Sequence, residues 1–147
     1  MAVFVPTYLY KRYPITGADF AGPRAALQRA GLTCHFVETD EDGAIETNTD
    51  LVVAAIQAHS HSGHRLIVVS ASKSGPEVAL ALTKLGSAGT RHIAAWVNIV
   101  GALQGTPLAD TRALPEIENK LGQVNLAGVD SLTTVSYTHL TLPTTSR

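Results

Sequence analysis

The sequence has little of what marks the more specialised protein classes. Its single cysteine, Cys34, excludes an intrachain disulfide. Its 11 basic and 12 acidic side chains give a net charge of −1, so nothing points to a nucleic-acid partner. No apolar run approaches the length of about 20 residues that a membrane helix needs, and no signal-peptide pattern follows Met1. We therefore expect a cytoplasmic globular protein without an integral membrane segment, whose oligomeric state the sequence leaves open.

With 147 residues, the chain is long enough for one domain with a real core. Its most informative stretch is a predicted strand, a short turn and a predicted helix. Residues 66–69 form an uninterrupted aliphatic run, typical of a strand buried on both faces of a parallel sheet. Helix-forming residues follow from Pro76. The segment between the predicted strand and the predicted helix is Ser70-Ala71-Ser72-Lys73-Ser74-Gly75. This order, small-x-Ser-x-small, fits a nucleophile elbow, a turn so tight that only small residues fit two positions either side of the central serine.

Ser72 is the candidate nucleophile of this turn. A serine hydroxyl is a weak nucleophile until a base removes its proton, so the fold must hold its Oγ within reach of a histidine. The helix that follows offers unpaired N–H groups and a positive dipole end to a developing oxyanion. We expect a strained backbone at Ser72, costing about 1–3 kcal/mol. The usual elbow is Gly-x-Ser-x-Gly, and Ser70 and Ser74 replace its glycines here.

Three segments in order carry a resemblance to a known family. They are Val3-Phe4-Val5-Pro6-Thr7-Tyr8, the turn at Ser72, and residues 96–100 followed by Gly-Thr-Pro-Leu-Ala-Asp at 105–110. Together they resemble the lipase and esterase branch of the α/β-hydrolase superfamily over residues 2–110. The resemblance implies a serine hydrolase that acts on a small-molecule ester or lipid through an acyl-enzyme on Ser72, without a cofactor. It also implies that the backbone N–H groups of Tyr8 and Lys73 hold the oxyanion.

The predicted elements alternate as in a parallel sheet with helices on both faces. Strands are expected over residues 2–9, 32–37, 66–69 and 92–100, and helices over residues 19–30, 45–59 and 76–85, with a turn at 86–90. We therefore predict an α/β fold, a three-layer sandwich with a mostly parallel sheet of about four strands. If the topology follows the family, the first strand lies between the second and third. Tyr8 and Ser72 then meet in the crevice at the carboxyl edge of the sheet.

Two clusters invite a metal interpretation, and we expect neither to bind a metal. His59, His61 and His64 fall close together, but their loop precedes a strand and so lies at the opposite edge from the expected active site. The acidic loop at residues 38–43 lacks the ligand spacing of a known calcium loop.

Three tyrosines surround the end of the first predicted strand. Tyr8, Tyr10 and Tyr13 either line an acyl pocket or cover an edge of the core. We favour the second role, because amphipathic rings commonly cover a core edge.

The rest of a catalytic triad is missing from the sequence. The family carries its acid and its histidine on loops after two further strands, and no room for these is left before Arg147. A literal search offers Ser72, Asp130 and His139, which we reject for this reason. We expect the chain as written to be nearly inactive, because the Ser72 proton has no acceptor.

Residues 135–144, Val-Ser-Tyr-Thr-His-Leu-Thr-Leu-Pro-Thr, resemble the in-frame translation of a transposase sequencing adaptor. A match of this length makes chance a poor explanation. We therefore divide the chain into a partial α/β-hydrolase domain at residues 1–134 and a non-native tail at residues 135–147. Artefactual segments of this kind are left out of fold reasoning.

Two other interpretations stay open. A dinucleotide-binding domain also has a turn between strand and helix, but that turn needs several glycines after the first strand, and here only Gly75 follows the third. Alternatively, the chain is a non-catalytic α/β binding module in which Ser72 only caps a helix. The spacing Ser70-x-x-Lys73 of β-lactamases lacks its companion motifs and is set aside.

Overall fold

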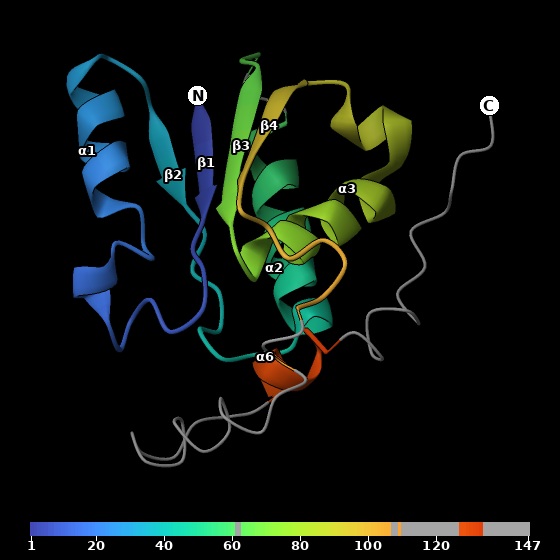
Figure 1. Cartoon of the computed structure of the whole chain (residues 1–147). Helices are drawn as coiled ribbons and strands as arrows, with labels where there is room; N and C mark the ends of the chain where they lie inside the picture. Colours follow the sequence, from blue (N-terminus) through green and yellow to red (C-terminus); the bar gives the residue numbers. More distant parts are fainter. Residues whose placement is uncertain (61–62, 107–108, 110–126, 134–147) are drawn as a thin grey trace.

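The computed structural model describes residues 1–60, 63–106, 109 and 127–133. Its four described strands are β1 (Ala2–Val5), β2 (Cys34–Phe36), β3 (Leu66–Ala71) and β4 (Ile93–Ile99). They form one all-parallel sheet in the order β2-β1-β3-β4 (Figure 1). The described helices are the 3-10 turn η1 (Pro14–Thr16), α1 (Ala21–Arg29), α2 (Ile45–His59), α3 (Ser74–Thr90) and the short α6 (Ala127–Asp130). The predicted α/β fold, with the first strand between the second and third, is confirmed.

Alternate residues of the central strands face opposite layers. Val3 and Val5 of β1 join a core cluster with Val52 of α2 and Val78 of α3. Ala2 and Phe4 point the other way, into a cluster that includes Phe20 just before α1. Figure 1 shows the result: α1 lies on one face of the sheet, and α2 and α3 lie on the other. Continuous aliphatic runs form these strands because both faces are buried.

β4 is less completely covered than its neighbours. Its residues Val97 and Ile99 pair with Val69 and Ala71 of β3, so they belong to the face that carries α1. Their side chains are 45% and 48% exposed. Within the described part of the chain, α1 packs over the β2 end of the sheet and leaves this face of β4 open.

The element ends differ from the predictions for identifiable reasons. β1 stops at Val5 rather than residue 9, because Pro6 has no N–H to donate to a ladder. β3 continues past the aliphatic run through Ser70 and Ala71. Of the turn predicted at 86–90, only the break at Gly86 is present: the backbone leaves helical geometry there, with φ 62° and ψ −175°, and a second helical segment of α3 continues to Thr90. None of the described helices is both long and apolar enough to cross a membrane.

Candidate active site

Ser72 lies between the end of β3 and the start of α3, at the carboxyl edge of the sheet. Its φ of 48° is in the left-handed region, which is unfavourable for a residue with a side chain. Ser72 is exposed, whereas Ser70 and Ser74 on either side are fully buried. The strained backbone expected here is therefore present, and it turns the Ser72 hydroxyl outward.

Three backbone hydrogen bonds hold the strained residue in place. The Ser72 N–H donates to the carbonyl oxygen of Ile99 at the end of β4, at 3.1 Å. The Ser72 carbonyl accepts from the N–H groups of Gly75, at 3.0 Å, and Ala102, at 3.1 Å. A strained conformation persists only where its surroundings fix it in this way. The turn is thus fixed by β4 and the loop after it as well as by α3.

The serines that replace the usual glycines are tied into the fold. The Oγ of Ser74 accepts from the Ala71 N–H at 2.9 Å, and it lies 2.9 Å from the carbonyl oxygens of both Val5 and Ala71. Since a hydroxyl has one proton, it donates to one of these carbonyls at a time. Ser70 Oγ accepts from Trp96 Nε1 at 2.8 Å. Both hydroxyls are therefore satisfied in the core, and Ser74 links the turn to the end of β1.

Gly75 brings the first turn of α3 against the loop after β4. A Cβ added to Gly75 would lie 2.8 Å from the Cα of Gly101 and 3.0 Å from Asn98 Oδ1. The Gly101 backbone could avoid a Cβ at that distance only if the whole loop after β4 moved. Glycine at this position allows the close approach that the elbow needs.

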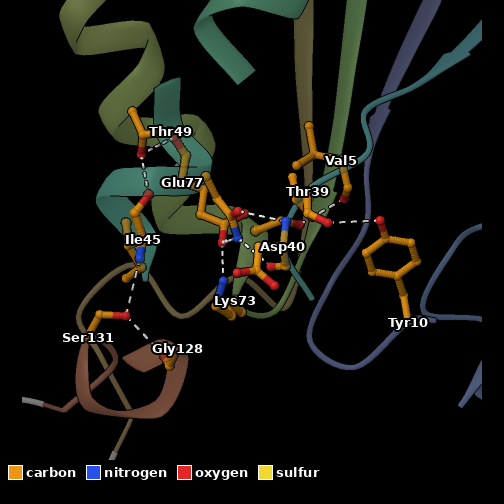
Figure 2. Close-up of polar contacts among 12 residues, drawn as sticks. Val5, Tyr10, Thr39, Asp40, Ile45, Thr49, Lys73, Glu77, Gly128 and Ser131 are labelled. Carbon is orange, nitrogen blue, oxygen red and sulfur yellow. Dashed lines mark hydrogen bonds and ion pairs between the residues drawn. The ribbon is translucent and has the colours of Figure 1, made fainter. Parts of the chain in front are cut away.

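A buried ion pair lies directly beneath the turn. Lys73 Nζ donates to Glu77 Oε1 one helical turn further on, and the two side chains are 3% and 1% exposed (Figure 2). Asn48 Nδ2 donates to the same carboxylate oxygen at 2.9 Å, whereas Glu77 Oε2 has no hydrogen-bond partner among the described residues. Burial raises the pKa of the Glu77 carboxyl above its usual value, although Lys73 and Asn48 act in the opposite direction. This pair was not predicted from the sequence, where its signal is a Lys and a Glu four residues apart at the start of a helix whose following residues are apolar.

The same network joins the start of α2 to the start of α3. Asn48 pairs with the backbone of Asp40, accepting from its N–H at 2.9 Å and donating to its carbonyl at 2.8 Å. Thr49 Oγ1 lies 2.7 Å from the carbonyl of Ile45 and 3.3 Å from that of Glu77 (Figure 2). The buried polar side chains of Asn48 and Thr49 therefore fix the start of α3, the helix that follows Ser72.

Two cavities flank Ser72. The larger, about 490 Å³, lies toward the loop after β1 and is lined by Tyr8, Tyr13 and Phe20 beside Ser72. The smaller, about 140 Å³, lies on the other side and is lined by Tyr8, Ser72, Lys73, Thr106, Ala109, Val129 and Leu132. Tyr8 and Ser72 border both cavities, as predicted for residues that meet at the carboxyl edge.

The tyrosines divide between the two expected roles. Tyr10 is buried, and its hydroxyl donates to the Thr39 carbonyl at 3.0 Å, so it covers the core. Tyr8 packs against the core cluster that contains Ile45, as predicted, and it also lines the larger cavity beside Ser72. Tyr13 lines the same cavity.

The described histidines lie away from Ser72. His35 of β2 stacks on His59 at the end of α2, with ring centroids 3.8 Å apart, and His92 immediately precedes β4. His61 and His139, like the adaptor-like tail, lie outside the described residues. Asp130, at the end of α6, is exposed. In the described ranges, no group of three or more His, Cys, Asp or Glu side chains could hold a metal ion.

The helix-cap interpretation of Ser72 is wrong. α3 begins at Ser74, its N-cap residue is Lys73, and no side chain forms a cap hydrogen bond there. The exposed Ser72 hydroxyl therefore has no part in starting the helix. In the first turn of α3, the Gly75 N–H already donates to the Ser72 carbonyl and Pro76 has no N–H, so what this helix start offers an anionic group is chiefly its positive dipole end.

Comparison with known proteins gives structural likeness only. No protein-family model and no curated protein sequence matches the chain. Among solved structures, it resembles a metagenomic carboxyl esterase with a TM-score of 0.74 and 18% identity, covering 100% of this chain and 46% of that one. A mature lipase of Bacillus licheniformis matches with a TM-score of 0.69 and 22% identity, over 95% of this chain and 56% of that one. Phospholipase PlaB from Legionella pneumophila matches with a TM-score of 0.61 and 13% identity, over 94% of this chain and 34% of that one.

These identities are too low to show more than a shared fold. The chain spans 46% to 56% of the length of the first two structures. It therefore has the α/β fold of solved esterases and lipases over about half of their length.

Proposed function

We propose that this chain carries the nucleophile of a serine hydrolase that acts on carboxylic esters. The observation that carries the proposal is the backbone of Ser72, an exposed serine at φ 48° between β3 and α3. Strained residues of this kind concentrate at active sites. The likeness of the fold to solved esterases and lipases supports the same reaction class, with a small-molecule ester or a lipid as substrate.

In the proposed reaction, Ser72 Oγ attacks the ester carbonyl carbon while a base takes the hydroxyl proton. The carbonyl oxygen becomes an oxyanion, and the bond from the carbon to the alcohol oxygen then breaks. The base returns the proton to the departing alcohol, which leaves the acyl group on Ser72. Water, activated by the same base, releases the acid and restores the serine. The reaction needs no cofactor and no metal.

The backbone N–H groups of Tyr8 and Lys73 are the proposed oxyanion donors. Tyr8 follows β1, which pairs with β3. Tyr8 and Lys73 both border the smaller cavity beside Ser72. Lys73 precedes the first turn of α3, where the helix dipole adds positive potential. Removing one such donor from an oxyanion site typically lowers kcat by about 100- to 1,000-fold.

The base is the part that the described residues do not supply. Their histidines lie in or before strands, or at the end of α2, rather than at the carboxyl edge. We therefore expect the chain alone to form an acyl-enzyme slowly and to show no sustained turnover. Imidazole added to the solution is a small base that can reach an exposed serine and replace the missing side chain.

The test is covalent labelling of the chain with a fluorophosphonate probe, with and without imidazole, followed by peptide mass mapping. We expect the probe on Ser72, and we expect imidazole to accelerate its attachment. Ser87, an exposed serine on α3 with ordinary backbone geometry, is the internal control. Ser72→Ala should abolish the Ser72 adduct and leave the background unchanged. Labelling of Ser72 at the rate of Ser87 would overturn the proposal and favour a non-catalytic binding module.

A further inference from the structure

We propose that the site takes esters with a short acyl group, held in the smaller cavity, and a larger alcohol group, held in the larger cavity. This inference rests on the proposed function. It follows from the unequal size, chemistry and enclosure of the two cavities that share Tyr8 and Ser72. An ester bond placed on Ser72 must direct one of its two halves toward each cavity.

The walls of the smaller cavity are apolar and buried. Ala109, Val129 and Leu132 belong to one core cluster together with Ile45, and Tyr8 packs against it. Lys73 also borders this cavity, but its ammonium group is paired with Glu77. A pocket with these walls favours a hydrocarbon group over a polar one.

The walls of the smaller cavity are also fixed in place. The Thr106 N–H donates to the Leu132 carbonyl at 3.0 Å. The Gly128 N–H donates to the Asp42 carbonyl at 2.9 Å, and Ser131 Oγ accepts from the Ile45 N–H at 3.3 Å. The contact between Ser131 and Ile45 attaches the end of α6 to the start of α2 (Figure 2). The wall formed by Val129 and Leu132 is therefore tied to the rest of the fold, which favours a cavity that keeps its size.

The volume limits the acyl group. An apolar cavity of about 150 Å³ in another protein holds one benzene molecule, and this cavity measures about 140 Å³. The carbonyl carbon itself remains at Ser72, outside the cavity. An acyl group of up to about six carbons fits, and a fatty acyl chain of ten or more does not.

The larger cavity suits the alcohol half. Its volume of about 490 Å³ lies in the range of sites for drug-sized ligands, about 300–1,000 Å³. Phe20 forms a buried apolar wall, while Thr16 and Gly17 at its rim are exposed. The alcohol must leave before water attacks the acyl-enzyme, so the more open and more polar side suits the leaving group.

The experiment is a competition for Ser72 between p-nitrophenyl esters of different acyl length. The complete chain is incubated with imidazole and equal amounts of the acetyl, butyryl, hexanoyl and decanoyl esters, and the acyl group on Ser72 is identified by peptide mass mapping. The alcohol and the base are constant, so the ratio of adducts reports only the acyl group. We expect the butyryl adduct to exceed the decanoyl adduct by about tenfold or more.

Two variants that change the volume of the smaller cavity in opposite directions test its role. Ala109→Leu should fill it and lower the butyryl-to-acetyl ratio at least about fivefold, and Leu132→Ala should raise the share of longer acyl groups. Ala18→Leu, which borders only the larger cavity, is the matched control and should leave the acyl ranking unchanged. Circular dichroism verifies that each variant is folded. If Leu132→Ala does not fold, the result for Ala109→Leu alone tests the cavity assignment.

The outcomes separate this inference from the proposed function. Equal acylation by decanoyl and butyryl esters, or an Ala109→Leu variant with the original ratios, would overturn the cavity assignment while Ser72 remained the nucleophile. Absence of any Ser72 adduct would overturn both. A reversed ranking, with long chains favoured, would assign the acyl group to the larger cavity.

Discussion

The ammonium group of Lys73 and the carboxylate of Glu77 form a buried ion pair within one helical turn of an exposed serine. Pairs of this kind add little net stability, because removing two charges from water costs nearly as much as their attraction returns. Their removal one partner at a time is costly, since an unpaired charge is then left in the core. The pair therefore fixes the position of the first turn of α3 more than it stabilises the fold.

Glu77→Leu should lower the free energy of unfolding by about 3–5 kcal/mol, because Lys73 is left buried and unpaired. The double variant Lys73→Met with Glu77→Leu should recover most of this loss. Urea denaturation measures both. The exposed pair Lys84–Asp50, at 2.7 Å, is the control, and Asp50→Ala should cost no more than about 1 kcal/mol. A double variant as unstable as Glu77→Leu would show that packing, rather than charge, dominates here.

Ser72→Gly should raise the free energy of unfolding by about 1 kcal/mol. Glycine removes about 1–3 kcal/mol of backbone strain at φ 48°, and its extra freedom in the unfolded chain returns about 0.5–1 kcal/mol of that gain. Thermal unfolding of Ser72→Gly, Ser72→Ala and wild type gives the comparison, in which Ser72→Ala keeps the strain. Equal stability of all three would mean that the left-handed backbone is not strained in solution.

Gly75→Ala should cost clearly more stability than Gly22→Ala. A Cβ at Gly75 meets the Gly101 backbone at 2.8 Å, whereas a Cβ at Gly22 in α1 meets nothing within 4 Å. We expect Gly75→Ala to cost about 1–3 kcal/mol through overpacking. Gly22→Ala should change stability by less than about 1 kcal/mol, because the gain from restricting the unfolded chain is offset by the contact of the new Cβ with the ring of Pro23, the next residue. Chemical denaturation of the two variants side by side is the measurement, and a neutral Gly75→Ala would contradict the close approach of α3 to the loop after β4.

Stability should fall as the pH falls below the usual pKa of histidine. Burial, with a smaller contribution from the charge of His59, lowers the pKa of His35 below 6.5 in the folded chain. In the unfolded chain the pKa returns to its ordinary value, so the unfolded state binds more protons between the two pKa values. The contribution of His35 is therefore complete above 6.5 and is lost as the pH falls toward the folded-state pKa.

Urea denaturation between about pH 8 and about pH 5 measures this dependence. His35→Gln removes the titrating group and should flatten the lower part of the curve. An unchanged slope in His35→Gln would assign the dependence to other groups.

Much of the fold follows from local pattern. The aliphatic runs at Val3–Val5 and Leu66–Val69 can be buried on both faces only in a parallel sheet, and the turn signals between them set the helices. The elbow was visible because its steric demand restricts residue type at fixed positions on either side of Ser72. Both features depend on neighbours in the sequence, and both were predicted.

The unpredicted parts of the site depend on residues far apart in the sequence. Asn48 reaches Glu77 across 29 positions, and Val129 and Leu132 reach the wall of the smaller cavity from a segment without a helical pattern. A Lys and a Glu four residues apart usually form an exposed pair on a helix surface. Only the packing of α2 against α3 makes this pair buried.

The hydroxyl of Ser74 lies against the carbonyl of Val5, 69 positions earlier in the chain. Ser72 itself donates its N–H to Ile99 of β4 and accepts from Ala102, so the geometry of this bend depends on contacts with β1 and β4 as well as on the turn itself. A shortened first strand would therefore remove a contact of the turn at Ser72 without changing any residue within that turn. A peptide that contains only residues 65–90 would carry the sequence of the turn but would lack the contacts from β1 and β4.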